Sequence, residues 1–206
     1  MHTSKINLAV LRTLLLIAAL GCAASLHASS DITPLELVQD TSSRMLAALK
    51  DNKAAIKQDS SRLYDLVSTI VLPYFDFERM SQWVLGKNWR TATPEQRDRF
   101  VEQFRALLVR TYGQALSDYA NEKIIYLPFA GDLSAPTVTV RTEIEQAGST
   151  IPISYSMYRS RDGWKVYDVA ISGVSLVTNY RSSFGNIIRD KGIDNLIRQL
   201  TDKNRS

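Results

Sequence analysis

Residues 71–90, VLPYFDFERMSQWVLGKNWR, hold two Trp, one Tyr and two Phe within twenty positions. Pro73 predicts the end of any preceding helix, because proline cannot donate the backbone hydrogen bond that a helix interior needs. Asp76 is then suited to cap a new helix, and Gly86 is suited to end it. The stretch therefore predicts a break in the chain followed by a short helix rich in aromatic side chains.

One face of this short helix is expected to be apolar. Phe77, Met80 and Val84 lie three and four residues apart, which places them on the same side of a helix, and Trp83 borders that side. So much aromatic surface exceeds what a short connector needs. Two interpretations follow: the rings form a packed corner of the core, or they wall a cavity.

The first 28 residues have the features of a secretory signal peptide. Lys5 and Arg12 precede an apolar run over residues 14–24, which is too short to span a bilayer. Small residues follow and end at Ala28, the favoured cleavage position, with positions 24 and 25 as alternatives. We therefore expect a cleaved leader and a mature protein outside the cytoplasm.

Cys22 offers a rival interpretation, a lipoprotein signal, but Ala19 stands where such signals usually carry a larger aliphatic residue. Cleavage after residue 28 would remove Cys22, the chain's one cysteine, and both histidines, His2 and His27. The mature chain would then lack the residues for Ser-His-Asp or Cys-His catalysis, for histidine or cysteine metal sites and for internal disulfides. It would hold 23 basic and 21 acidic residues, a net charge of +2 that does not indicate non-specific nucleic-acid binding.

The chain after the leader begins with helical patterns. Thr33 and Pro34 predict a helix start, and an apolar stripe then extends to about residue 52. A second helix is expected over residues 60–72, and the polar residues 53–59 fit either a loop or a continuation. Thr93 and Pro94 open the longest expected helix, residues 94–119. Its apolar face includes Phe100, Phe104, Leu107, Leu108, Thr111 and Ala115.

The apolar pattern then changes from helical to alternating. Strands are expected over residues 123–129, 137–146, 151–159 and 164–171, joined by short turns, and helices follow at about residues 180–188 and 193–200. This order predicts an α+β fold: N-terminal helices, a twisted antiparallel sheet of about four strands and C-terminal helices, in a single domain over residues 29–206. The second strand places Val138, Val140, Thr142 and Ile144 on one side.

Asp168 is the one candidate for acid–base chemistry. If it shared a strand face with Val166, its carboxylate would lie among apolar neighbours and could act as a base of raised pKa. The alternative is an acid at a strand end that is held by backbone donors or by arginine, for which Arg181 is a candidate. Ser175 and Ser182 have no histidine to activate them, and the sequence shows no glycine-rich phosphate loop and no metal-ligand spacing.

Two long segments of the chain resemble the MlaC family. They are VLPYFDFERMSQWVLGKNWRTATPEQRDRFVEQFRALLVRTY, residues 71–112, and VYDVAISGVSLVTNYRSSF, residues 166–184. This family, also called the toluene-tolerance family, is the periplasmic component of the Mla phospholipid-transport system of Gram-negative bacteria. The likeness extends over about residues 33–200.

The resemblance implies a fold somewhat like nuclear transport factor 2, with a deep apolar pocket and no catalytic role. The pocket would take the acyl tails of a glycerophospholipid and leave the headgroup near solvent, so phospholipid is cargo and no cofactor or metal is implied. The implied partners are an outer-membrane lipoprotein–porin complex and an inner-membrane ABC transporter complex with a periplasmic lipid-binding subunit. A monomer would carry lipid between them and maintain the lipid asymmetry of the outer membrane.

The expected pocket lining consists of apolar residues from three parts of the chain. They are Val71, Leu72, Tyr74, Phe75, Met80, Val84, Phe104, Leu108, Tyr112, Val140, Ile153, Tyr155, Val169, Val174 and Val177. A cavity wall and a core wall share the same periodicity, so the pattern assigns these residues to an apolar interior without separating the two.

Two other classes of function fit the same pattern. One is a small-molecule enzyme on a similar fold with Asp168 as the base, which would need a polar cavity. The other is a periplasmic adaptor for protein surfaces, which would need an exposed apolar patch. For a carrier, Arg97, Arg99 and Arg105 are candidate docking residues, against the alternative of an ordinary solvated helix face.

Overall fold

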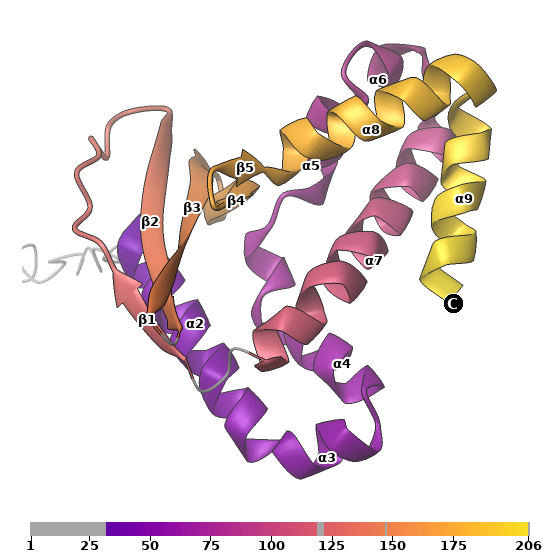
Figure 1. Cartoon of the computed structure of the whole chain (residues 1–206). Coiled ribbons are helices and arrows are strands. Elements are labelled where there is room, and N and C mark those ends of the chain that lie inside the picture. Colours follow the sequence, from indigo (N-terminus) through magenta and orange to yellow (C-terminus); the bar gives the residue numbers. More distant parts are fainter. Residues whose placement is uncertain (1–31, 119–121, 147, 206) are drawn as a thin grey trace, which may run out of the picture. The chain divides into compact units, whose positions relative to one another are not determined.

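Residues 32–118, 122–146 and 148–205 are described by a computed structural model, drawn in Figure 1. The expected signal peptide, with Cys22 and both histidines, lies outside these residues. In the described part of the chain, no helix has the length and apolar character that a membrane span requires.

Three helices open the described chain: α2 (Pro34–Asp51), α3 (Lys53–Gln58) and α4 (Ser61–Ile70). The start of α2 is fixed by a reciprocal cap, in which the Glu36 backbone N–H donates to Thr33 Oγ1 over 3.2 Å and the Thr33 N–H donates to Glu36 Oε2 over 2.8 Å. Residues 53–59, which fitted either a loop or a continuation of the first helix, are mostly helical, because α3 covers Lys53–Gln58.

The aromatic stretch folds as a 3₁₀ turn, η1 (Leu72–Tyr74), followed by α5 (Phe77–Leu85) and α6 (Lys87–Thr91). Asp76 caps α5 as predicted, since its Oδ1 accepts from the Arg79 backbone N–H over 2.8 Å. Gly86 ends α5 with φ +54°, a backbone conformation that residues other than glycine rarely adopt. The Asp76 N–H also donates to the Val166 carbonyl over 2.9 Å, which ties this turn to the sheet.

The sheet of the described residues has five antiparallel strands in the order β1-β2-β3-β4-β5, and so one more than the expected four. These are β1 (Lys123–Tyr126), β2 (Thr137–Gln146), β3 (Ser149–Ser160), β4 (Gly163–Ile171) and the short β5 (Val174–Ser175). One face of β2 is buried through Val138, Val140 and Thr142, in agreement with the predicted alternation. The α+β fold class is confirmed.

Three helices pack together beyond the sheet: the long α7 (Pro94–Asp118), α8 (Leu176–Lys191) and α9 (Ile193–Arg205). In Figure 1, α8 runs from β5 toward α9, and α9 lies along the N-terminal half of α7. Gly192, with φ +79°, separates α8 from α9 as its position predicted.

The buried apolar residues form two clusters. The main cluster joins the N-terminal part of α2, α5, α7, α8, α9 and the sheet, and it includes Phe100, Phe104, Met157 and Ile197. The smaller N-terminal cluster consists of Met45, Leu49, Leu63 and Val67, from α2 and α4. A cavity lies at the seam between the two clusters.

Candidate functional site

The inner cavity is enclosed by α2, α4, η1, α5, α7 and one face of the sheet, and it has a volume of about 250 Å³. Both clusters contribute to its walls: Met45, Leu49 and Val67 belong to the N-terminal cluster, and Met80 and Leu108 belong to the main cluster. The two bodies of core therefore do not merge, and an apolar hollow remains between them.

No charged side chain lines the inner cavity among the described residues. Its polar side chains all carry neutral hydroxyl groups: Thr41, Ser42, Tyr74, Tyr112, Thr142 and Tyr155. Such a lining suits hydrocarbon and disfavours a charged group, because a charge without a partner is costly in an apolar surrounding. The expected polar cavity of a small-molecule enzyme is absent at this place.

Most of the expected lining residues border the inner cavity. They are Val71, Leu72, Tyr74, Phe75, Met80, Leu108, Tyr112, Ile153, Tyr155 and Val169. Five elements (η1 with its flanks, α5, α7, β3 and β4) thus converge on one hollow. Of the two interpretations of the aromatic stretch, the cavity wall is the one that the geometry favours.

Five of the expected lining residues lie elsewhere. Four of them are buried in the main cluster, where side chains of α7, α8 and the sheet surround them: Val84, Phe104, Val140 and Val177. Val174 is 56% exposed, because it stands in the two-residue strand β5 next to a turn. These five residues therefore do not border the inner cavity.

The whole contribution of α2 was missed. Seven of its residues border the inner cavity: Leu37, Val38, Thr41, Ser42, Met45, Leu46 and Leu49. Their three- and four-residue spacing was visible as an apolar stripe, but a stripe does not reveal what lies opposite. The informative feature was Thr41 and Ser42, two small polar residues that interrupt the stripe.

Burial raises the pKa of two tyrosine hydroxyl groups of the cavity, those of Tyr112 and Tyr155. Burial, with a smaller contribution from the nearby Tyr180 hydroxyl, raises the pKa of Tyr112 to about 12. Burial also raises the pKa of Tyr155, an effect that the Thr142 hydroxyl opposes and the Tyr126 hydroxyl reinforces. Both phenols therefore remain hydrogen-bond donors at physiological pH.

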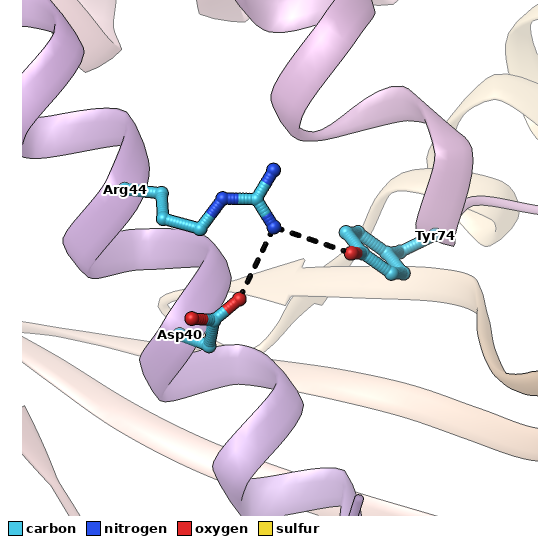
Figure 2. A network of polar contacts seen from close by, with 3 residues as sticks. All are labelled: Asp40, Arg44 and Tyr74. Atoms are coloured by element: carbon cyan, nitrogen blue, oxygen red, sulfur yellow. Dashed lines mark hydrogen bonds and ion pairs between the residues drawn. The ribbon is translucent and has the colours of Figure 1, made fainter.

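A cation stands beside one of the lining residues. Figure 2 shows Arg44 of α2 between Asp40 and Tyr74: its Nη1 donates to Asp40 Oδ2 over 3.2 Å and to the Tyr74 hydroxyl over 3.4 Å. The side chains of Arg44 and Asp40 are 47% and 50% exposed, whereas Tyr74 reaches the inner cavity. The hydrogen bonds to Tyr74 and Asp40 raise the pKa of Arg44. This trio joins the charged surface to the apolar interior.

A second, larger hollow, the outer groove, lies between α7 and the segment from α4 to α6, with a volume of about 1,260 Å³. Its lining mixes aromatic residues with charged ones, including Arg105 of the expected docking residues. Arg97 also borders it, but its Nε donates to the Trp89 carbonyl over 2.9 Å, which ties α7 to α6.

The inner cavity and the outer groove share four lining residues, Leu72, Phe75, Phe77 and Val109. We call these four residues the partition. Phe75 and Phe77 stack within it, with ring centres 5.8 Å apart. One layer of side chains therefore separates the apolar hollow from an open, partly charged groove.

Asp168 is not placed for chemistry in the inner cavity. The register between β3 and β4 shifts where Ser156 faces Asp168 and Met157 faces Val166. This bulge puts both Val166 and Val169 on the inner face, while Asp168 is not among the cavity's lining residues. Its Oδ2 accepts from Ser175 Oγ over 2.6 Å, and its Oδ1 accepts from the Val177 N–H over 3.1 Å.

This geometry decides between the two interpretations of Asp168. The acid is held by donors at the start of α8, and the idea that it shares a face with Val166 is wrong. The guanidinium of Arg181, the suggested partner, lies against Gly86 instead. Among the described residues, no three or more His, Cys, Asp or Glu side chains are grouped so as to hold a metal ion.

Comparison with known proteins shows which family has a similar sequence. Residues 39–202 match the model of the family described as MlaC protein. The chain is 32% identical over 178 residues to the intermembrane phospholipid transport system binding protein MlaC of Haemophilus influenzae, covering 84% of this chain and 83% of that protein. It is 30% identical over 163 residues to the toluene tolerance protein ttg2D of Pseudomonas putida, covering 79% and 76%.

A solved structure is similar as well. The phospholipid-binding protein of Ralstonia solanacearum, determined in complex with a phospholipid, superposes with a TM-score of 0.77 at 31% identity, over 82% of this chain and 95% of that chain. Family match, curated relatives and solved fold agree over most of the sequence, and the chain belongs to the MlaC family.

Proposed function

We propose that this protein is a periplasmic carrier that binds the acyl tails of a glycerophospholipid in the inner cavity. It takes lipid from, or delivers it to, an outer-membrane lipoprotein–porin complex and an inner-membrane ABC transporter complex, and so maintains the lipid asymmetry of the outer membrane. The names of the relatives support the phospholipid cargo, and the expected leader supports the compartment. The observation that carries the proposal is a hollow between two core clusters in which none of the lining residues that the structure describes is charged.

Hydrocarbon transfer gives the energetic reason for such a hollow. Each methylene moved out of water is worth about 0.8 kcal/mol, so a sixteen-carbon tail is worth roughly 12 kcal/mol. Free lipid is therefore very rare in water, and a carrier must offer a lining nearly as favourable as a bilayer. Aliphatic and aromatic side chains from α2, η1, α7 and the sheet supply that lining.

The inner cavity has to widen to accept its cargo. Its volume of about 250 Å³ is below the roughly 300–1,000 Å³ of ordinary small-molecule sites, and a diacyl phospholipid is larger than most of their ligands. The partition is the wall whose displacement adds the most space, because the outer groove of about 1,260 Å³ lies directly behind it. Insertion of a tail then separates Leu72, Phe75 and Phe77 from Val109 and joins the two hollows.

Recognition through the tails implies weak selectivity for the headgroup. A charged phosphate has no partner within the inner cavity and stays outside it. The cation beside the lining, Arg44, is already paired with Asp40. We therefore expect lipids of equal tails and different headgroups to bind within a few-fold of one another, as exposed ion pairs contribute little.

Native mass spectrometry of the purified protein tests the carrier function directly. We expect one diacyl phospholipid per chain to remain bound, to be released by solvent extraction, and to rebind from vesicles. The extracted lipid identifies the tails. A protein that is empty and stays empty after incubation with phospholipid vesicles would overturn the proposal and favour a protein-binding adaptor.

A further inference from the structure

Thr142 holds a buried hydroxyl group that the fold does not satisfy. The residue is 1% exposed at the centre of β2, opposite Tyr126 of β1 and Ile153 of β3, and it faces the inner cavity. Among the described residues, its Oγ1 makes no hydrogen bond of acceptable geometry, although the Tyr155 hydroxyl lies close enough for Thr142 to oppose the rise in the Tyr155 pKa. A buried polar group without a partner destabilises a protein, so such a group is informative when it lines a binding site.

The hydroxyl groups of Tyr155 and Thr41 are among the five others that border the same hollow. Tyr155 lies on the neighbouring strand β3, paired with Val140, so its ring stands one position along the inner face from Thr142. Thr41 faces the hollow from α2, and its Oγ1 is also buried without a partner. The hydroxyl groups of Thr142 and Tyr155, on two adjacent strands, therefore form a small polar spot in the apolar cavity, and Thr41 adds a hydroxyl group from α2 to the cavity lining.

The chemistry of the cavity limits what this spot can bind. A phosphate or an amine is excluded because, over residues 32–118, 122–146 and 148–205, no charged side chain lines the cavity, and burial of an unpaired charge is costly. The methylene groups of a tail have no acceptor at all. The one neutral acceptor that is attached directly to each acyl tail is its ester carbonyl.

We propose that Thr142, together with Tyr155, donates hydrogen bonds to an ester carbonyl oxygen of the lipid in the inner cavity. This inference rests on the proposed carrier function and adds to it the place at which the ester group of the lipid is held. The hydroxyl groups set how far an acyl tail enters, and they distinguish ester-linked lipids from ether-linked ones. The latter have the same tails and headgroup but no carbonyl oxygen.

Competition between two lipids tests this inference. Delipidated protein is mixed with equal amounts of a diacyl phosphatidylethanolamine and its dialkyl ether analogue of the same chain length, and the bound lipids are counted by native mass spectrometry. We expect the unmodified protein to prefer the ester lipid roughly 3- to 10-fold, the range of one neutral hydrogen bond. Thr142→Val, which keeps the shape and removes the hydroxyl, should reduce the preference to about 1, and Tyr155→Phe should reduce it in part.

Thr139→Val is the matched control. Thr139 lies on the same strand as Thr142 and points to the opposite face of the sheet, outside the inner cavity, so its variant should keep the full ester preference. Thermal unfolding of the empty protein adds an independent readout. Thr142→Val should raise the Tm of the delipidated protein, because it removes an unsatisfied buried group.

The outcomes separate the inference from the carrier function. Equal binding of ester and ether lipids by the unmodified protein would overturn the inference, for instance because an ordered water satisfies Thr142, while the carrier function would stand. A lower Tm for Thr142→Val would also overturn it, because the hydroxyl would then have a structural partner. Binding of neither lipid would overturn both.

Discussion

The two halves of α7 have the same apolar spacing and different surroundings. In the first half, Phe100 and Phe104 are fully buried and pack against Tyr180 and Phe184 of α8, with ring centres 5.3–6.1 Å apart. In the second half, Leu108, Val109, Tyr112 and Gly113 border the inner cavity. One continuous helix thus has a dense end and a hollow end.

The difference lies in what faces the helix. Helices α8 and α9 lie along the first half of α7 and fill the space with aromatic and aliphatic side chains. The second half packs directly on α4, and it faces α2 and the sheet across the inner cavity. The comparison teaches that the cavity in this fold arises where the core is left unclosed, and not from a special kind of residue.

Loss of an aromatic side chain at the dense end should have the largest effect. We expect Phe104→Ala to lower the free energy of unfolding by about 3–5 kcal/mol, because it leaves a void among closely packed rings. Tyr112→Ala at the hollow end should cost clearly less, since Tyr112 is only partly buried and already borders empty space. Urea unfolding of both variants in the delipidated state measures the difference, and equal losses would contradict the division of α7.

Neighbouring leucines at the boundary of the two halves allow a sharper test. Leu107 is buried in the main cluster away from the inner cavity, whereas Leu108 borders it. Leu107→Trp should overpack the core and cost about 1–3 kcal/mol of stability, yet keep bound lipid. Leu108→Trp should place its ring in the hollow, retain most of the stability, and reduce lipid binding at least tenfold.

Native mass spectrometry for lipid and urea unfolding for stability separate these two effects. Loss of lipid from Leu107→Trp with full retention by Leu108→Trp would show that the cargo does not occupy the inner cavity. Because both variants carry the same new side chain on adjacent positions of one helix, a general effect of tryptophan cannot produce opposite results.

Features set by local interactions were the ones that the sequence predicted well. The Thr33 and Asp76 caps, the Gly86 helix end and the alternation of β2 each depend on residues close together in the chain, and the structure confirms all of them. The α+β order follows from the same local patterns. The cavity does not, because its walls come from elements that meet only in the folded protein.

The errors have physical causes as well. Phe104 and Leu108 are one helical turn apart on the same face, and only the position of α8 puts the first in solid core and the second on the cavity. The face of Asp168 could not be predicted, because a bulge changes the alternation of β4 at that point. A strand of two residues such as β5 is too short to show any period.

Asp168 stands at the junction between the sheet and α8, and its removal should have a moderate effect. We expect Asp168→Ala to cost about 1–2 kcal/mol of stability, because the Val177 N–H and Ser175 hydroxyl lose a charged acceptor. Asp168→Asn, which retains a neutral acceptor, should cost less. Both variants should bind lipid as the unmodified protein does, as measured by native mass spectrometry. An Asp168→Asn protein of normal stability without lipid would indicate a direct role in binding instead.

The exposed trio in Figure 2 should show the smallest effect. Arg44 is paired with Asp40 and touches Tyr74 at the long distance of 3.4 Å, so we expect Arg44→Ala to leave the Tm nearly unchanged. The effect of this substitution on lipid affinity should depend only on the charge of the headgroup. The affinity for anionic phosphatidylglycerol should fall less than about threefold, and the affinity for zwitterionic phosphatidylethanolamine should fall less still. The difference should vanish at high salt, because exposed charges are screened. A much larger loss of affinity, shared by both lipids and insensitive to salt, would mean that the trio of Asp40, Arg44 and Tyr74 keeps the inner cavity open. The packing at the hollow end of α7 would then depend on surface contacts more than the packing at its dense end does.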